Sequence, residues 1–198
     1  MAFSSLLLGF RRLRVNVVRI LRAIPLNWTT LTANFMGAHI CCYKAVMAVA
    51  VFDTRLVKGE VTFQNISAGV HVEAIFTRLP PGEHGFHIHR AGDLRGEGCK
   101  KACDHFHKGP ASSHGGPPGF KGPRHTGDLG NVSLPESSDP VIRSYKYTVK
   151  DITVKNLCGR SVIVHADEDD YGLGGEEDSK TTGHSGKRIA CAVIGRCE

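Results

Sequence analysis

The chain has 198 residues, which is enough for one well-packed domain and too few for two ordinary ones. Its formal net charge is +6, but residues 1–46 hold six of the 25 basic residues and no acid, which leaves 19 basic and 19 acidic residues after them. Because the body of the chain is neutral, the composition argues against a basic nucleic-acid-binding face.

The leader, up to about residue 44, is rich in arginine, free of acids and moderately apolar. This composition fits a transit peptide or an amphipathic surface helix, and a secretory signal less well because Leu6-Leu7-Leu8 is a short apolar run that precedes the arginines. A non-functional upstream extension, with Met47 as the start of the ancestral domain, is the alternative that we favour. We therefore expect a poorly ordered or helical leader over 1–44 and one domain over 45–198. No stretch approaches the roughly 18 apolar residues of a membrane-spanning helix.

From Ala45 onward the sequence predicts β-strands, because β-branched residues recur in short runs that turn residues interrupt. In Val70–Phe76 the apolar residues alternate, so that they share one face of a strand. Helical periodicity is weak and confined to the leader. The expected strands are 48–52, 59–63, 70–76, 85–89, 131–134, 141–154, 161–165 and 189–194. Strands of this kind favour an all-β sandwich or barrel.

Two long loops interrupt these strands, at about Arg90–His125 and Ala166–Lys187. Both are rich in glycine, histidine and charged residues. Loops of this length inside a compact domain are usually functional.

The first long loop and its flanks hold a pattern of histidines. His87 and His89 lie two apart on an expected strand, so both rings project from one face while Ile88 points to the opposite, buried face. Surface histidines often show this spacing, and His165, at the end of another apolar strand, would alone be interpreted as structural. Three imidazoles and a carboxylate, from His105, His114, His125 and Asp128, suit a closed zinc site. A mobile histidine-rich loop is the alternative, but the two halves together favour a copper or zinc centre.

Other sequence signals are less specific. The seven cysteines (41, 42, 99, 103, 158, 191 and 197) form neither an obvious disulfide framework nor a CxxC metal set. Triplets that begin at Asn27, Asn65 and Asn131 match glycosylation acceptors, which chance produces often.

Three motifs carry a resemblance to a known family. His84-Gly85-Phe86-His87-Ile88-His89 resembles the first signature of the copper/zinc superoxide dismutases, and Gly127–Asn131 matches the end of their zinc loop. Gly183–Cys191 resembles their C-terminal signature. The resemblance covers residues 45–195 and implies an all-β Greek-key sandwich or barrel of the immunoglobulin-like kind, with two long functional loops.

The resemblance also implies one copper and one zinc per chain. Copper would be bound by His87, His89, His105 and His165, and zinc by His105, His114, His125 and Asp128. The ring of His105 would be deprotonated and shared, which only two flanking cations make reasonable near neutral pH. Asp169 would hydrogen-bond one copper ligand and one zinc ligand. Without the resemblance, we would interpret it as one acid in the solvated run 167–170.

The implied activity is the disproportionation of superoxide to oxygen and hydrogen peroxide by a redox-cycling copper, in antioxidant defence. His105 would take up a proton when copper is reduced, and Arg188 would hold the anionic substrate beside the metal. Cys99 and Cys191 would form the disulfide that positions Arg188, although a disulfide in a reducing cytosol is unusual. Thr182 would line the channel mouth, and the second loop with Lys187 would shape the field that draws superoxide inward.

Several positions depart from the family pattern. Cys103 and His107 stand in the zinc loop, where the family usually has neither; we expect His107 to be solvated, with competition for zinc as the alternative. Arg90 and Ala91 replace an acidic-aromatic pair near the usual dimer contact, so we expect a homodimer with an altered interface. Cys103 and Cys197 either form a second disulfide or, as we favour, remain free thiols.

Two other functions are consistent with this fold. A copper chaperone usually lacks copper ligands and carries a cysteine-rich transfer motif, whereas this chain has all four histidines and Cys41-Cys42 lacks the CxxC spacing. A catalytically silent decoy that binds zinc or buffers copper is less consistent with intact ligands. We therefore expect an enzyme that acts on superoxide, receives copper from a chaperone, binds neither nucleic acid nor membrane, and is cytoplasmic, with organelle targeting or secretion as alternatives.

Overall fold

The computed structural model describes residues 47–110, 112–137 and 141–197. The predicted leader lies outside these residues. Within them the chain forms the strands β1 (Met47–Asp53), β2 (Lys58–Ile66), β3 (Gly69–Arg78), β4 (His84–His89), β5 (Asp128–Val132), β6 (Arg143–Lys150), β7 (Ser161–His165), β8 (Arg188–Val193) and β9 (Gly195–Arg196). Its helices are the 3-10 helix η1 (Glu97–Ala102) and the α-helices α1 (Val154–Leu157) and α2 (Ser179–Thr182).

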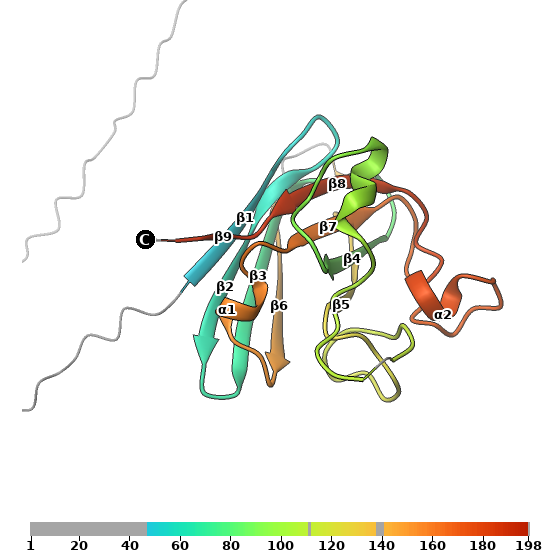
Figure 1. The fold of residues 1–198 in the computed structure, drawn as a ribbon. Coiled ribbons are helices and arrows are strands. Elements are labelled where there is room, and N and C mark those ends of the chain that lie inside the picture. Colours follow the sequence, from blue (N-terminus) through green and yellow to red (C-terminus); the bar gives the residue numbers. More distant parts are fainter. Residues whose placement is uncertain (1–46, 111, 138–140, 198) are drawn as a thin grey trace, which may run out of the picture. The chain divides into compact units, whose positions relative to one another are not determined.

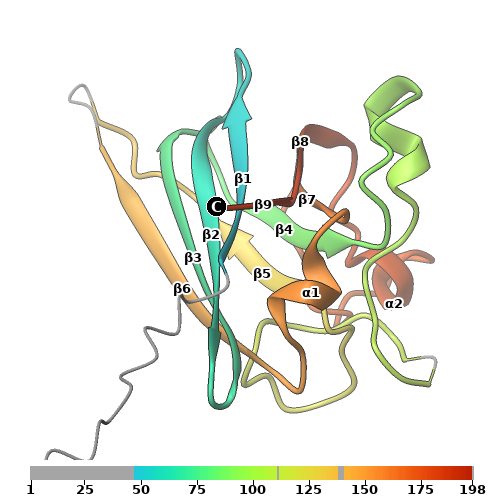
Figure 2. The same cartoon turned by 60° about the vertical axis from the view of Figure 1, so that its left-hand side comes forward.

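The strands form two antiparallel sheets that pack face to face (Figures 1 and 2). One sheet has the order β6-β3-β2-β1-β9, and the other has the order β5-β4-β7-β8. The neighbours β4 and β7 come from distant parts of the chain, as do β3 and β6, which is the crossing of a Greek key. The predicted all-β Greek-key sandwich is confirmed.

The core lies between the sheets and follows from the alternation of apolar residues. Val70, Val72, Ala74 and Phe76 of β3 are fully buried, as their shared face predicts, and the residues between them are half-buried. The ring of Phe76 contacts that of Phe86 from the opposite sheet edge-on, with a centroid distance of 5.6 Å. These contacts fix the distance between the two layers.

The four-stranded sheet is buried on both of its faces. All six residues of β4 and all five of β7 are buried, although alternate side chains must point in opposite directions. The second face is covered by the two long loops, which Figure 2 shows beyond this sheet together with η1 and α2. The two histidines of the predicted pair, His87 and His89, therefore lie under the loops, whereas Ile88 lies in the core.

One predicted strand is too long. The expectation of a strand over 141–154 is wrong after Lys150, because Asp151 has a φ of 60° and turns the chain. Thr153 then caps α1 through a reciprocal pair of contacts with Asn156, a capping box. Helices of four residues have no apolar period to detect, so α1 and α2 were not predicted.

Within the described residues, no helix is long and apolar enough to span a membrane.

Candidate metal centre

Strands β4 and β7 place three histidines on the loop-covered face of the four-stranded sheet. His87 is paired in register with Ile163, and His89 with Ser161, so that His165 at the end of β7 lies on the same side. The first long loop is fastened to β4 by the bridge between His89 and His105 and by the hydrogen bond from the Phe106 amide to the Ile88 carbonyl, 2.7 Å. These main-chain bonds bring His105 against the three strand histidines.

The first cluster consists of four buried imidazoles, those of His87, His89, His105 and His165, each offering one nitrogen within 4.8 Å of the others. The rings of His87 and His105 have centroids 4.0 Å apart, and the Nε2 atoms of His89 and His165 are 3.4 Å apart. Burial lowers the pKa of each ring, that of His165 to about 3. The rings are therefore neutral and keep a lone pair for a metal.

The second cluster joins three imidazoles to one carboxylate. Asp128 Oδ1 lies 2.9 Å from His105 Nδ1, 3.2 Å from His114 Nδ1 and 3.4 Å from His125 Nδ1. Burial alone would raise the pKa of Asp128, but the three imidazoles outweigh it and hold that pKa well below its usual range. The carboxylate is therefore ionised and, like the three nitrogens, is a suitable zinc ligand.

His105 belongs to both clusters through opposite atoms of one ring. Its Nδ1 faces Asp128, while its Nε2 faces the strand histidines and is buried. His105 Nε2, His87 Nδ1 and His125 Nδ1 have no hydrogen-bond partner in the part of the chain that the structure describes. Buried polar atoms are nearly always paired. Three unpaired imidazole nitrogens aimed into two clusters fit two metals, copper among four nitrogens and zinc among three nitrogens and an oxygen.

Asp169 links the two clusters from outside. Its Oδ2 accepts a hydrogen bond from His87 Nε2 and its Oδ1 accepts one from His114 Nε2, both at 2.7 Å. Each bond leaves the Nδ1 of the same ring facing its cluster, which fixes the tautomer that a metal requires. Burial would lower the pKa of His114, but Asp128 and Asp169 together raise it to about 9, so a metal bound at Nδ1 would displace a proton from this ring.

Asn131 positions Asp169, a role that the sequence analysis did not assign. Its side-chain amide donates to the Asp169 carbonyl over 2.9 Å, and its side-chain oxygen accepts from the Asp169 amide over 2.7 Å. The amide nitrogen that a glycan would require is therefore used inside the protein. The position of Asn131 in the motif Gly127–Asn131 is the sequence signal that could have pointed to this role.

Gly183 and His84, two further residues of the sequence motifs, have structural roles beside the clusters. Gly183 has a φ of +70°, and a Cβ there would lie 2.2 Å from Asp169 Oδ1, so no larger residue fits. His84 contacts the main-chain oxygens of His165 (2.9 Å) and Pro80 (3.1 Å) through its two ring nitrogens. It is a structural residue and joins neither cluster.

Arg188 lies beside the first cluster at the start of β8. Its guanidinium donates to the carbonyl oxygens of Cys99 (2.7 Å) and Cys103 (2.5 Å), and burial lowers its pKa. The predicted disulfide between Cys99 and Cys191 is present and ties η1 to β8. The thiols of Cys103 and Cys197 are free.

An opening of about 520 Å³ leads to this arginine. It is lined by Glu97, Gly98, Lys100, Gly186, Lys187 and Arg188. Thr182 is not among these residues, and its hydroxyl donates to Asp178, so its place at a channel mouth stays a prediction. His107 also lies outside both clusters and accepts a hydrogen bond from the Thr126 amide, 3.2 Å.

Comparisons with known proteins agree with this geometry. The family model described as copper/zinc superoxide dismutase matches residues 57–194. A Cu-Zn superoxide dismutase of Paramecium bursaria Chlorella virus 1 is 42% identical over 84% of this chain and 86% of the viral protein. A copper chaperone for superoxide dismutase of Rattus norvegicus is 41% identical over 75% of this chain, but over only 53% of its own length. The crystal structure of the clock protein EA4 superposes with a TM-score of 0.68 at 39% identity, covering 76% of this chain and 94% of EA4. The chain belongs to the copper/zinc superoxide dismutase family and is an enzyme of that type.

Proposed function

We propose that this chain disproportionates two superoxide anions and two protons to oxygen and hydrogen peroxide, using one copper and one zinc that share His105. Superoxide dismutation follows from the family. The shared ligand is supported by one observation: the two nitrogens of the His105 ring belong to different donor clusters, and the Nε2 atom is buried without a partner among the described residues.

Copper would be held by His87, His89, His105 and His165, and zinc by His105, His114, His125 and Asp128. When bound, copper supplies one-electron redox chemistry, and zinc supplies a fixed positive charge beside the shared ring. Asp169 keeps His87 and His114 in the tautomers whose Nδ1 atoms face the metals.

His105 Nε2 is the atom that we propose to hold the proton destined for peroxide. The contact of Nδ1 with Asp128, 2.9 Å, fixes the plane of the ring. Nε2 therefore remains directed at the strand histidines whether or not it carries a proton. A fixed ring delivers its proton to one place, next to the substrate position.

Arg188 binds superoxide beside the first cluster. Two carbonyl hydrogen bonds hold its guanidinium plane, which leaves its other donors to a small anion at the base of the opening. Lys100 and Lys187 line the same opening, with Glu97 as its one lining acid. This excess of positive charge attracts superoxide from solution.

The similarity to a copper chaperone does not favour delivery as the function of this chain. The four imidazoles of the first cluster are all present and buried together, as an enzyme requires. We propose instead that such a chaperone supplies the copper. We also propose a homodimer, supported by the exposed apolar side chains of Val51 on β1 (59%) and Val193 on β8 (42%).

The proposal is tested on the full chain, loaded with zinc and then copper, by counting both metals and measuring superoxide dismutation on one sample. We expect one copper and one zinc per chain and fast, copper-dependent activity. His105→Ala should lower the content of both metals, because it removes a ligand from each cluster. His107→Ala, two residues away and outside both clusters, should retain both.

Two outcomes would contradict the proposal. Unchanged metal content in His105→Ala would show that the ring does not serve both sites. Full occupancy by copper and zinc without activity would assign the chain to metal buffering or to a decoy role.

A further inference from the structure

Tyr171 lies two residues after Asp169 in the second long loop and has a backbone conformation that is unusual for a tyrosine. Its φ is 58°, in the left-handed region that favours glycine, and Gly172 continues the turn with a φ of 70°. The turn directs the main-chain amide of Tyr171 at the carboxylate that links the two clusters, and this amide donates to Asp169 Oδ1 over 2.8 Å. Strain of this kind is concentrated at functional sites, where the surrounding contacts offset it.

The phenol of Tyr171 completes the hydrogen bonding of Asn131, the residue that positions Asp169. The Asn131 side-chain amide donates to the Tyr171 hydroxyl oxygen over 3.3 Å and to the Asp169 carbonyl oxygen over 2.9 Å. Its side-chain oxygen accepts from the Asp169 amide over 2.7 Å. Both amide hydrogens of Asn131 are thus used. Without the hydroxyl, one of them would lose its acceptor, and the amide plane would be held by the Asp169 contacts alone.

The ring of Tyr171 joins the two long loops. It contacts the ring of Phe120, in the first loop, with a centroid distance of 6.1 Å. Phe120 in turn lies over Gly116, where a Cβ would come within 2.6 Å of the Phe120 ring. The loops also meet one residue further on, because a Cβ at Gly172 would lie 2.6 Å from the His114 carbonyl oxygen. Tyr171 therefore lies where the loop of the proposed zinc ligands meets the loop of Asp169.

We propose that Tyr171 is a positioning residue for both metal sites. Its amide, and its hydroxyl through Asn131, hold Asp169 where each carboxylate oxygen accepts one imidazole Nε2–H. These two hydrogen bonds, from His87 and His114, fix the tautomers whose Nδ1 atoms face the metals. Tyr171 thus affects the binding of both metals although it belongs to neither cluster. The inference rests on the proposed function, in which His87 binds copper and His114 binds zinc.

The experiment compares the wild-type chain with Tyr171→Phe, which removes the hydroxyl and keeps the ring and the backbone turn. Both full chains are loaded with zinc and reduced copper, which are diamagnetic, so that NMR detects the Nε2–H protons of His87 and His114. In Tyr171→Phe we expect exchange of these protons with solvent, and zinc release to a chelator, each to become about three- to ten-fold faster. The effect is smaller than the roughly 10- to 100-fold effect of removing a ligand's own partner.

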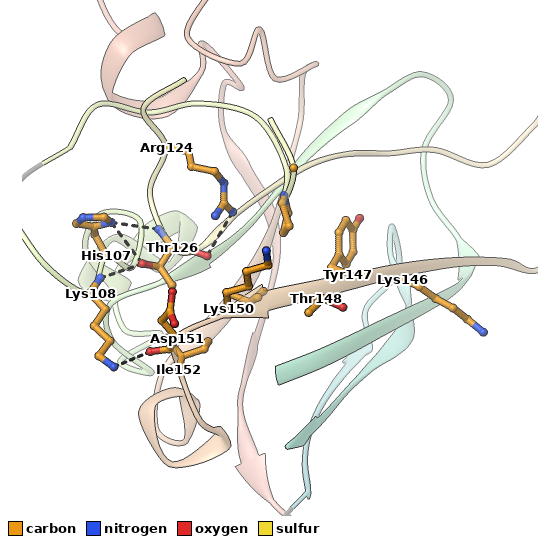
Figure 3. Close-up of a pocket in the computed structure, with 13 residues that line it drawn as sticks. His107, Lys108, Arg124, Thr126, Lys146, Tyr147, Thr148, Lys150, Asp151 and Ile152 are labelled. Atoms are coloured by element: carbon orange, nitrogen blue, oxygen red, sulfur yellow. Dashed lines mark hydrogen bonds between the residues drawn. The ribbon is translucent and has the colours of Figure 1, made fainter. Parts of the chain in front are cut away.

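Two phenols of β6 provide matched controls for the loss of a hydroxyl. The Tyr145 hydroxyl is hydrogen-bonded to Ser133 as donor and as acceptor, at 2.7 Å each, so Tyr145→Phe should lower Tm. Tyr147 lies on the wall of a hollow of about 560 Å³ between β6 and the first long loop (Figure 3), and its buried hydroxyl has no hydrogen-bond partner in the described ranges. Tyr147→Phe should not lower Tm, because it removes a polar group that lacks a partner. Neither control should change the two imidazole protons or zinc release.

A double-mutant cycle tests whether the hydroxyl acts through Asn131. In an Asn131→Ala background, Tyr171→Phe should accelerate zinc release no further. The proposal fails if Tyr171→Phe leaves the imidazole protons and zinc release unchanged, if Tyr145→Phe alters them equally, or if the effects of Tyr171→Phe and Asn131→Ala are additive. Failure of the proposed function would show differently, as missing copper or zinc or absent dismutation in the wild-type chain.

Discussion

Arg188 donates a hydrogen bond to the main-chain oxygen of Cys103 over 2.5 Å, and His89 Nδ1 contacts the same oxygen at 2.8 Å. One carbonyl therefore orients both the proposed substrate-binding arginine and a proposed copper ligand. Cys103 has a φ of 64° and a ψ of −153°, a conformation that belongs to glycine. The carbonyl is held in place at the cost of backbone strain.

Cys103→Gly should therefore stabilise the protein. Relief of the strain is worth about 1–3 kcal/mol, and the greater freedom of glycine in the unfolded chain offsets about 0.4–1 kcal/mol of that. We expect a net gain of about 1 kcal/mol and a rise in Tm of about 2–4 °C in thermal unfolding. Dismutation should change little because the carbonyl remains.

Cys103→Ala is the matched control, since it removes the thiol and keeps the Cβ that causes the strain. Equal stabilisation by Cys103→Ala and Cys103→Gly would show that the thiol, and not the backbone, is responsible.

Asp169→Asn should weaken both metal sites at once. An asparagine amide cannot accept hydrogen bonds at both positions, so His87 or His114 loses the partner that fixes its tautomer. We expect the affinity for copper and for zinc to fall about 10- to 100-fold, measured by competition with chelators. Glu168→Gln, an exposed neighbour, should have no effect. A loss confined to one metal would argue against the bridging role.

Lys187→Gln should lower the rate of dismutation chiefly at low salt. The lysine lines the opening at Arg188 and touches neither cluster, so its contribution is long-range attraction of the anion. We expect a decrease of about three-fold at low ionic strength that disappears near 1 M salt, where the Debye length is about 3 Å. Metal content should be unchanged. A decrease that persists at high salt would assign Lys187 a direct contact with substrate.

His184 should titrate above the ordinary histidine pKa of 6.5. Its Nδ1 donates to Asp178 Oδ1 over 2.7 Å, and this hydrogen bond to the carboxylate raises the pKa of the ring. The contribution of this hydrogen bond to folding stability is present below pH 6.5, where the His184 ring is protonated in both the folded and the unfolded chain. It is lost as the pH rises through the raised pKa that the ring has in the folded chain. NMR titration checks it: Asp178→Asn should return the pKa of His184 toward 6.5, and an unchanged pKa would exclude this pair as the cause.

The sequence predicted the strands well where apolar and polar side chains alternate. It predicted the two donor clusters well where histidines recur at close spacing. The β3 face and the histidine pair of β4 are examples, because burial there follows the strand period. Asp169 had no signal of its own within an acidic run, and only the family resemblance assigned it. The carbonyl of Cys103 has no sequence signal at all, because a main-chain oxygen is common to every residue. The end of β6 at Lys150 was missed because a positive φ at Asp151 is a property of the backbone.

The position of β6 has a consequence for encounters between copies of the chain. An outermost strand exposes unpaired main-chain groups that can pair with the same strand of another molecule and start aggregation. In eight residues β6 carries Arg143, Lys146 and Lys150 and no acid. Two such edges repel each other, so these cations protect the sheet from growing by addition of further chains.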